Sequence, residues 1–194
     1  MSETSHSLLD RLRSRPDGEA WQRLVGLYTP LLRGWLRRHG VQESDADDLV
    51  QEVLVVVVRD LPHFEHSRRP GAFRSWLRTT LAHRLRDFWR GRGYRPEAAG
   101  GSDFLKQFDE LEDPDSGLSR LWDQEHDRHV VRRLLEVIRP EFRPATWEAF
   151  AGVMLGGDRP AEVAGRLGVS VNAVLLAKSR ILARLRQVGR GLID

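Results

Sequence analysis

A segment rich in arginine and aromatic residues is the first part of the sequence that points to chemistry. From Arg68 to Arg95 it carries nine arginines against one acid, Asp87. Guanidinium groups contact phosphates, and aromatic rings stack on exposed bases. The segment provides no matching acids at helical pairing distance to neutralise the arginines. The pattern therefore favours single-stranded or melting DNA as the partner of six of them: Arg74, Arg78, Arg84, Arg86, Arg90 and Arg92.

A second segment gathers four carboxylates, which could in principle hold magnesium as in a nuclease. They are Asp45, Asp47, Asp48 and Glu52. All of them fall on one predicted helix, whose positive end the aspartates would also complement, and the sequence offers no complementary set of acids or histidines. His126 and His129 stand three residues apart, but two ligands do not make a zinc site. We therefore predict no enzyme, no metal site and no cofactor.

Residues 159–174 have the spacing of a helix-turn-helix. Pro160 suits the start of its first helix, Gly168 the left-handed turn residue, and Ser170 the cap of its second helix. An ordinary helical hairpin with a solvated basic helix is the alternative. The small core between the two helices is predicted to contain Val163, Leu167, Val169 and Val174.

The second helix of this pair, about residues 171–188, has the composition of a DNA-recognition helix. Its predicted buried residues are Val174, either Leu175 or Leu176, Ile181, Leu182 and Leu185. Its polar side chains would reach base edges and phosphates in a major groove. These projecting residues are Asn172, Lys178, Ser179, Arg180, Arg184 and Arg186.

Apolar residues at helical spacing predict the elements that position these groups. Helices are expected over residues 20–38, 44–61 and 72–90, and Trp76 falls at a core position of the third. Strand signals are nearly absent, so the class is all-α, with two small helical domains joined by a flexible acidic linker. The predicted organisation is an N-terminal extension at 1–19, a first domain at 20–95, the linker at 96–124 and a second domain at 125–194.

Composition narrows the class of protein further. The net charge is only +3, but nine acids stand between Gly101 and Asp127 against Lys106 and Arg120, so the chain is electrically segmented. There is no cysteine, which excludes disulfides and thiolate sites. No export signal is evident, and the longest apolar run, Val53 to Val58, is far too short to cross a bilayer. We expect a soluble, cytoplasmic protein without membrane insertion.

Four motifs in order resemble those of the extracytoplasmic-function (ECF) sigma factors of the sigma-70 family. The first runs from Asp45 through Asp47-Asp48-Leu49-Val50-Gln51-Glu52 to Val53, and the second is Phe73-Arg74-Ser75-Trp76-Leu77. Asp87 among arginines and the terminal helix-turn-helix follow. The resemblance covers roughly residues 20–95 and 125–187. It implies a non-enzymatic subunit that directs RNA polymerase to promoters.

The resemblance also assigns roles to residues. The acidic helix would dock on the β′ clamp helices of core RNA polymerase through Asp45, Asp48, Leu49, Gln51 and Glu52. The arginine-rich helix would contact the −10 promoter element through Arg74, Trp76, Arg78, His83, Arg84, Arg86, Arg90 and Arg92. The second domain would touch the β flap and read the −35 element through Ser170, Asn172, Lys178, Ser179, Arg180 and Arg184. An anti-sigma factor is a possible further partner.

The chain departs from the family pattern in its recognition helix, where relatives usually have threonine at Ala173, lysine near Leu175 and arginine at Ala177. His83 stands where relatives commonly have asparagine. A stand-alone helix-turn-helix regulator is the alternative function, although it leaves the first two motifs unexplained. From the charge segmentation we expect the acids of the linker to compete with DNA for the basic surfaces until polymerase separates the two domains.

Overall fold

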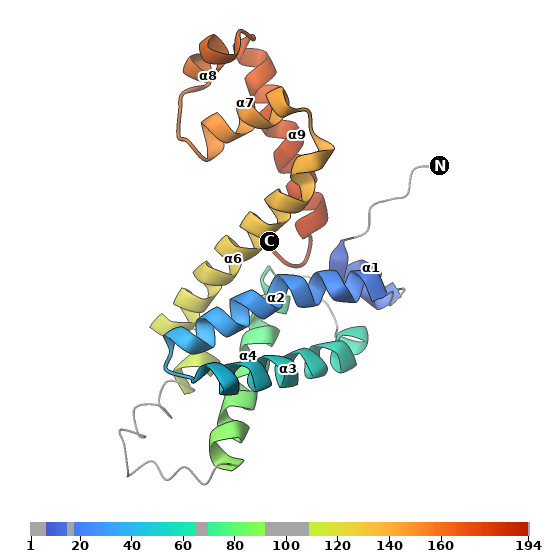
Figure 1. Ribbon diagram of the computed structural model, residues 1–194, viewed down its shortest axis with the longest axis vertical. Helices are drawn as coiled ribbons and strands as arrows, with labels where there is room; N and C mark the ends of the chain where they lie inside the picture. Colours follow the sequence, from blue (N-terminus) through green and yellow to red (C-terminus); the bar gives the residue numbers. More distant parts are fainter. Residues whose placement is uncertain (1–6, 15–17, 65–69, 92–108, 194) are drawn as a thin grey trace.

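The structure, a computed structural model, describes residues 7–14, 18–64, 70–91 and 109–193. Within these ranges the chain forms helices and no strand, which confirms the predicted all-α class. Figure 1 shows a lower and an upper lobe connected by one long helix, α6 (Gly117–Ile138). The lower lobe contains α1 (Leu8–Ser14), α2 (Gly18–Arg38), α3 (Glu43–Asp60) and α4 (Ala72–Gly91), and the upper lobe contains α7 (Pro144–Met154), α8 (Pro160–Leu167) and α9 (Val171–Gly189).

The lower lobe is a bundle in which α3 packs between α2 and α4. Each helix buries the apolar stripe that its sequence spacing predicts, because residues three and four apart share one face. Leu24, Leu32 and Trp35 of α2 are almost fully buried, and so are Phe73 and Leu77 of α4. The β-branched run at the end of α3 is helical, since burial of Val53 and Val57 in the bundle outweighs the local preference for a strand.

Helix α6 is the main difference from the predicted organisation. It begins at Gly117, where Ser116 accepts a hydrogen bond from the Ser119 amide at 2.9 Å, so the last part of the predicted linker at 96–124 is helical. Its first half packs against α2 and α4, and Trp122 and His126 are fully buried there. The flexible linker prediction therefore fails over residues 117–124, because Trp122 belongs to the core of the lower lobe. Residues 92–108 of the linker lie outside the described part of the chain.

The upper lobe is the predicted helix-turn-helix with α7 packed beside it. Val163 and Ala164 of α8 meet Val174 and Ala177 of α9 in a small core that also contains Ala149 of α7. Gly168 adopts a φ of 64°, the left-handed turn that its position predicted. The second half of α9 packs against α6, where Ile181 and Leu185 join the apolar cluster that continues from the lower lobe.

Candidate nucleic-acid and protein interfaces

The acidic helix α3 presents one exposed polar face. Asp48, Gln51 and Glu52 are exposed along it at the three- and four-residue spacing of a single helical face. Asp45 is only 6% exposed and Leu49 is fully buried. Their side chains have no surface to offer a partner, because they fall on the face that packs into the bundle, and we exclude both from the predicted polymerase-binding set.

Two apolar residues extend this face and were not included in the predicted set. Val55 is 65% exposed and Val58 is 43% exposed, and the two stand three residues apart on the outer face of the helix. They follow Gln51 and Glu52 at helical spacing, so the period of the sequence could have identified them. The exposed face of α3 thus combines acids, an amide and two apolar side chains.

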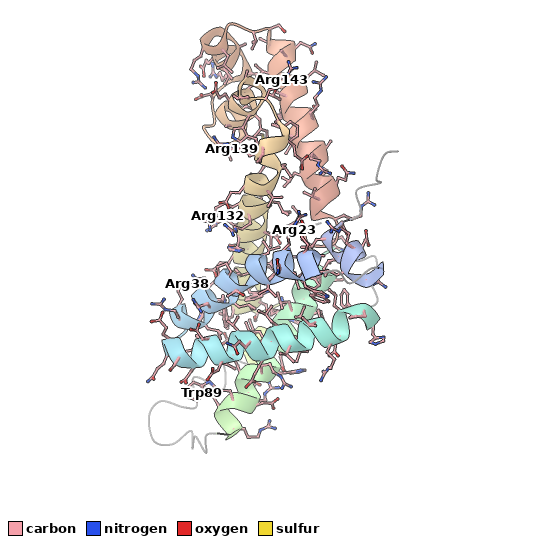
Figure 2. All side chains as sticks on the ribbon, turned by 45° about the vertical axis from the view of Figure 1, so that its right-hand side comes forward. Arg23, Arg38, Trp89, Arg132, Arg139 and Arg143 are labelled. Atoms are coloured by element: carbon pink, nitrogen blue, oxygen red, sulfur yellow. The ribbon has the colours of Figure 1, made fainter. Side chains whose placement is uncertain are left out.

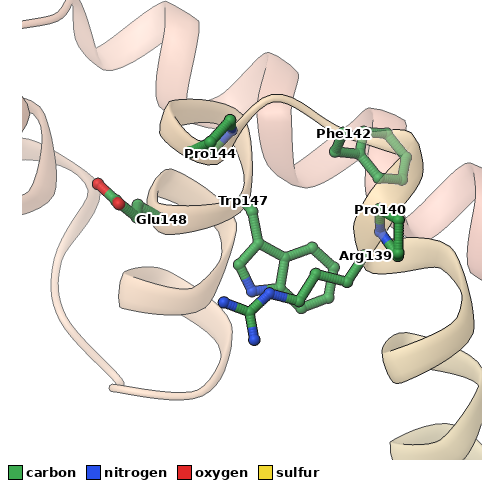
Figure 3. Close-up of a pocket in the computed structure, with 6 residues that line it drawn as sticks. All are labelled: Arg139, Pro140, Phe142, Pro144, Trp147 and Glu148. Carbon is green, nitrogen blue, oxygen red and sulfur yellow. The ribbon is translucent and has the colours of Figure 1, made fainter.

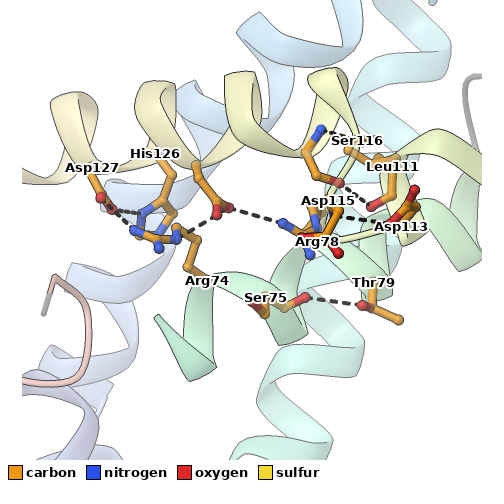
Figure 4. A network of polar contacts seen from close by, with 12 residues as sticks. Arg74, Ser75, Arg78, Thr79, Leu111, Asp113, Asp115, Ser116, His126 and Asp127 are labelled. Atoms are coloured by element: carbon orange, nitrogen blue, oxygen red, sulfur yellow. Dashed lines mark hydrogen bonds and ion pairs between the residues drawn. The ribbon is translucent and has the colours of Figure 1, made fainter. Parts of the chain in front are cut away.

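The lack of nearby acids in the sequence predicted that the arginines of α4 would be free of ion pairs. In the structure, acids from other elements contact several of them. Arg78 is 3% exposed, and its Nη1 lies 3.1 Å from Oδ1 of Asp123. The same carboxylate oxygen lies 3.2 Å from Nε of Arg74, whose Nη1 also contacts Asp127. Figure 4 shows this network between α4 and α6. The first half of α6 therefore neutralises the cations at the start of α4.

A buried histidine continues the network into α2. Nδ1 of His126 lies 3.0 Å from Oδ1 of Asp127, and Nε2 lies 3.1 Å from the hydroxyl oxygen of Tyr28. A carboxylate can only accept, so Nδ1–H donates to Asp127 and Nε2 of the neutral ring accepts from the tyrosine hydroxyl. Burial raises the pKa of Tyr28 well above its ordinary value, and the charge of Asp127 adds to this effect. Tyr28 therefore remains a donor at any physiological pH.

Acidification is expected to destabilise the lower lobe through its histidines. Burial lowers the pKa of His126 below its ordinary value, although the neighbouring Asp127 opposes this effect. Burial also lowers the pKa values of His129 and His39. Below about pH 6.5 the unfolded chain then binds more protons than the folded chain. The contribution of these histidines to the free energy of unfolding is fully present above that pH. It is lost as the pH falls toward their lower pKa values in the folded state.

The measurement is the urea midpoint between pH 7.5 and pH 5.5, which should fall on acidification in the wild type and less steeply in His126→Gln. Asp127 does not titrate in this range, because burial raises its pKa but hydrogen bonds from His126 and Arg74 outweigh burial and lower it overall. A midpoint that is constant across the range would contradict the assignment.

The far end of α4 is also covered by acids from the chain before α6. Both terminal nitrogens of Arg86 contact the carboxylate of Glu112 at 2.8 and 2.9 Å, and Nη2 also lies 3.1 Å from Asp109. Hydrogen bonding from Arg86 lowers the pKa of Glu112 despite partial burial. Nε2 of His83 lies 3.1 Å from the same carboxylate. Glu112 thus binds two members of the predicted −10 set.

The remaining members of that set differ in exposure. Arg90 is highly exposed and stands 4.0 Å from Asp87. Asp87 also pairs with Arg84 at 3.1 Å within the helix, so the segment does contain one acid at helical pairing distance, contrary to the prediction. Trp76 is half-buried against Phe64, with 4.9 Å between ring centroids, in agreement with its core spacing. Arg92 lies outside the described residues. Arg90 and His83 are the most exposed described members of the −10 set, with 72% and 54% of their side chains exposed, whereas Arg84 is 36% exposed and is paired with Asp87.

In the upper lobe the predicted −35 residues surround the start and the outer face of α9. The Ser170 hydroxyl accepts a hydrogen bond from the Ala173 amide at 3.2 Å, so it caps the helix as predicted. Asn172, Ser179 and Arg180 are exposed and Lys178 is half-buried. Arg184 instead forms a two-pronged contact with Glu141 at 2.6 and 2.9 Å, which ties α9 to the turn after α6.

Two apolar predictions for this lobe are wrong. Leu175 and Leu176 are 44% and 47% exposed, although one of them was expected in the core, because Ala177 occupies the inward position instead. Val169 is 40% exposed, since the left-handed turn at Gly168 directs the chain away from the small core. The amino-terminal half of α9 therefore presents leucines beside its polar residues.

A shallow pocket lies where α6 meets α7, apart from the predicted sets. Figure 3 shows Trp147 of α7 facing the turn that contains Pro140 and Phe142, with Pro144 and Glu148 at its edge. The guanidinium carbon of Arg139 lies 5.8 Å from the centre of the Trp147 ring, within cation–π range. Figure 2 shows Arg132, Arg139 and Arg143 along this side of the connection between the lobes.

The described part of the chain contains no cluster of three or more histidines and acids placed to hold a metal ion. His129 instead donates a local hydrogen bond: its Nε2 lies 2.8 Å from the Leu27 carbonyl oxygen, which can only accept, so Nε2–H is the donor. None of the described helices is both long enough and apolar enough to span a membrane.

The comparison with known families covers the lower lobe. The family model described as Sigma-70 region 2 matches residues 24–94, a stretch that contains most of α2 and all of α3 and α4. No curated protein matches the chain. The matched stretch thus includes the exposed face of α3 and the arginines of α4, and it ends before α6.

Proposed function

Because the match over residues 24–94 supports a sigma-70-type sigma factor, we propose that this chain is a sigma factor of the extracytoplasmic-function kind. It binds core RNA polymerase in the cytoplasm and directs promoter recognition, −10 melting and transcription initiation without catalysing a reaction itself. The observation that carries the proposal is the matched stretch itself, because one lobe brings together an exposed acidic and amide face and a cationic helix.

The polymerase-binding surface in this proposal is the outer face of α3. Asp48, Gln51 and Glu52 contact the β′ clamp helices, and the exposed Val55 contributes the apolar part of the interface. Such a mixture of a few charged groups around an apolar centre is typical of specific protein interfaces. The side chains of Asp45 and Leu49 support this face from within the bundle.

Promoter contacts are divided between the lobes. Helix α4 binds the −10 element. Arg90 is the most exposed of its cations, Arg84 becomes available when it leaves Asp87, and His83 and Arg86 become available after Glu112 withdraws. The upper lobe acts as the second, −35-reading domain and also touches the β flap. Since α6 packs against both lobes, binding to polymerase must alter these contacts if the lobes are to move to promoter spacing. An anti-sigma factor could act by holding the lobes as they are.

Removing the acids that cover α4 is expected to increase the affinity of the free protein for single-stranded −10 DNA. Asp109→Asn with Glu112→Gln frees Arg86 and His83 for phosphate contacts, so the dissociation constant should fall by about threefold to tenfold at low salt, and less at high salt. Fluorescence anisotropy with a labelled oligonucleotide measures this dissociation constant.

The matched control is Asp113→Asn with Asp115→Asn, which removes the same charge from exposed positions nearby that contact no cation among the described residues. An equal gain in DNA affinity in both variants would show that only the net charge of the protein matters. It would contradict the proposal that Glu112 competes with DNA for Arg86 and His83.

The decisive experiment is run-off transcription with purified core RNA polymerase and a library of upstream DNA, with and without this protein, followed by sequencing of the start sites. Protein-dependent initiation from sites that share −35 and −10 boxes is expected. The proposal fails if there is no initiation and no binding to core polymerase.

The capped and exposed helix α9 also favours a second candidate, a stand-alone helix-turn-helix regulator. Such proteins usually bind two half-sites as dimers. A stable dimer in gel filtration that binds duplex DNA tightly without polymerase would favour this candidate over the sigma factor.

A further inference from the structure

The outer face of α9 has an unusual composition for a helix that contacts DNA. Four exposed residues, Asn172, Leu176, Ser179 and Ala183, follow one another at intervals of four, three and four, which places them on one line along the helix. This line lies opposite the buried line of Val174, Ala177, Ile181 and Leu185. It is therefore the part of α9 that would enter a groove most deeply, and it contains no cation.

The cations stand on either side of that line. Arg180 and Arg186 are exposed and make no ion pair with any described residue, and the helix from Val171 to Gly189 contains no acid. Leu175 stands beside the line in the same turn as Leu176, and both leucines are nearly half exposed. A helix with flanking cations and no acid complements a polyanion, so a duplex is a better occupant of these leucines than an apolar protein groove.

From this arrangement, and resting on the proposed function, we propose that α9 reads the −35 element mainly through thymine methyl groups and one adenine. Leu175 and Leu176 contact C5-methyl groups of thymines, and Asn172 pairs with the N6 and N7 edge of an adenine. Arg180 and Arg186 bind the phosphates on the two sides of the groove. The element is therefore rich in A·T pairs where the first two turns of α9 lie against it.

The apolar part of this readout can be tested without changing the order of the bases. Deoxyuridine differs from thymidine only in the missing C5-methyl group, whose burial corresponds to about a fourfold change in affinity. In the promoter selected by run-off transcription, each thymine of the −35 box is replaced by deoxyuridine in turn, and binding by the complex of the full chain with core polymerase is measured.

We expect a loss of about threefold to fivefold at one or two thymines of the box and no loss at thymines outside it. In Leu175→Ala with Leu176→Ala, the deoxyuridine and thymine promoters should bind equally, because the methyl groups have lost their contacts. Leu155→Ala, which truncates a leucine that is 64% exposed in the turn after α7, is the control and should keep the full difference.

The outcomes separate this inference from the function on which it rests. If no promoter is selected at all, the proposed function fails. If a promoter is selected but deoxyuridine has no effect in the wild type, or the effect persists in the double leucine variant, the inference is wrong. If the leucine variant binds the promoter normally and loses affinity only for a protein, the leucines form a protein contact and the inference is likewise overturned.

Discussion

Replacing Trp122 by alanine is expected to lower the free energy of unfolding of the lower lobe by about 3–5 kcal/mol. The indole is fully buried, and its ring packs edge to face against Trp35 of α2 with 5.5 Å between centroids. Truncation leaves a cavity between α6 and α2 that neighbouring side chains cannot fill, and it removes the aromatic contact as well. Urea unfolding followed by far-ultraviolet circular dichroism measures the change.

Leu121→Ala is the control for this prediction, because it alters the neighbouring residue of α6 where the side chain is 42% exposed. Its effect should stay within about 0.5 kcal/mol. Trp122→Phe should fall between the two variants, since most of the ring volume remains. If Trp122→Ala costs less than about 1 kcal/mol, the first half of α6 is not part of the lower-lobe core, and the original linker prediction would regain support.

The second large effect is expected at the outer face of α3. Gln51→Ala with Glu52→Ala should weaken binding to core RNA polymerase by about tenfold or more, because polar groups at the centre of an interface commonly contribute more than 1 kcal/mol each. Folding should be unchanged, since both side chains are exposed. Surface plasmon resonance with immobilised core polymerase measures the affinity, and thermal unfolding checks the fold.

A chemically matched control lies on α2, where Glu19→Ala with Gln22→Ala removes the same atoms from an exposed helical surface. Glu19 pairs with Arg23 at 2.7 Å, but exposed ion pairs contribute only about 0–1 kcal/mol. Polymerase affinity should stay unchanged in this variant. Equal binding by the wild type and the α3 variant would remove the interface assignment.

Local features of the chain were predictable because their causes lie within a few residues. Gly168 takes the left-handed turn that only a residue without a Cβ adopts freely, and Ser170 caps α9 through the next turn of backbone. Leu49 could also have been placed correctly, because it follows Ala46 by three residues on the buried stripe of α3. The family resemblance assigned Leu49 to the interface, but the helical period placed it in the core.

The pairing of charges across the lower lobe was not predictable in the same way. Arg78 and Asp123 are 45 residues apart, and Arg74 and Asp127 are 53 residues apart. The excess of acid at residues 101–127 and the excess of arginine at 68–95 were plain from the sequence, and so was the expectation that the acids would compete with DNA for the basic surfaces. Which carboxylate meets which guanidinium depends on how α6 lies against α4.

The sequence by itself therefore determined helices α2, α3, α4, α8 and α9, the turn and cap of the helix-turn-helix, and the segments that carry acid and cation, because hydrophobic period, turn chemistry and net charge act over short distances. It did not indicate α1 or the first two turns of α6. Only the tertiary structure decided that α6 joins the lower lobe, that Arg78 is buried in an ion pair, and that Leu175 and Leu176 both face outward. The physical reason is that burial is a property of surfaces brought together by the whole fold. From sequence alone, a short apolar run can belong either to the core or to an exposed contact surface, and only the elements that pack against it decide which.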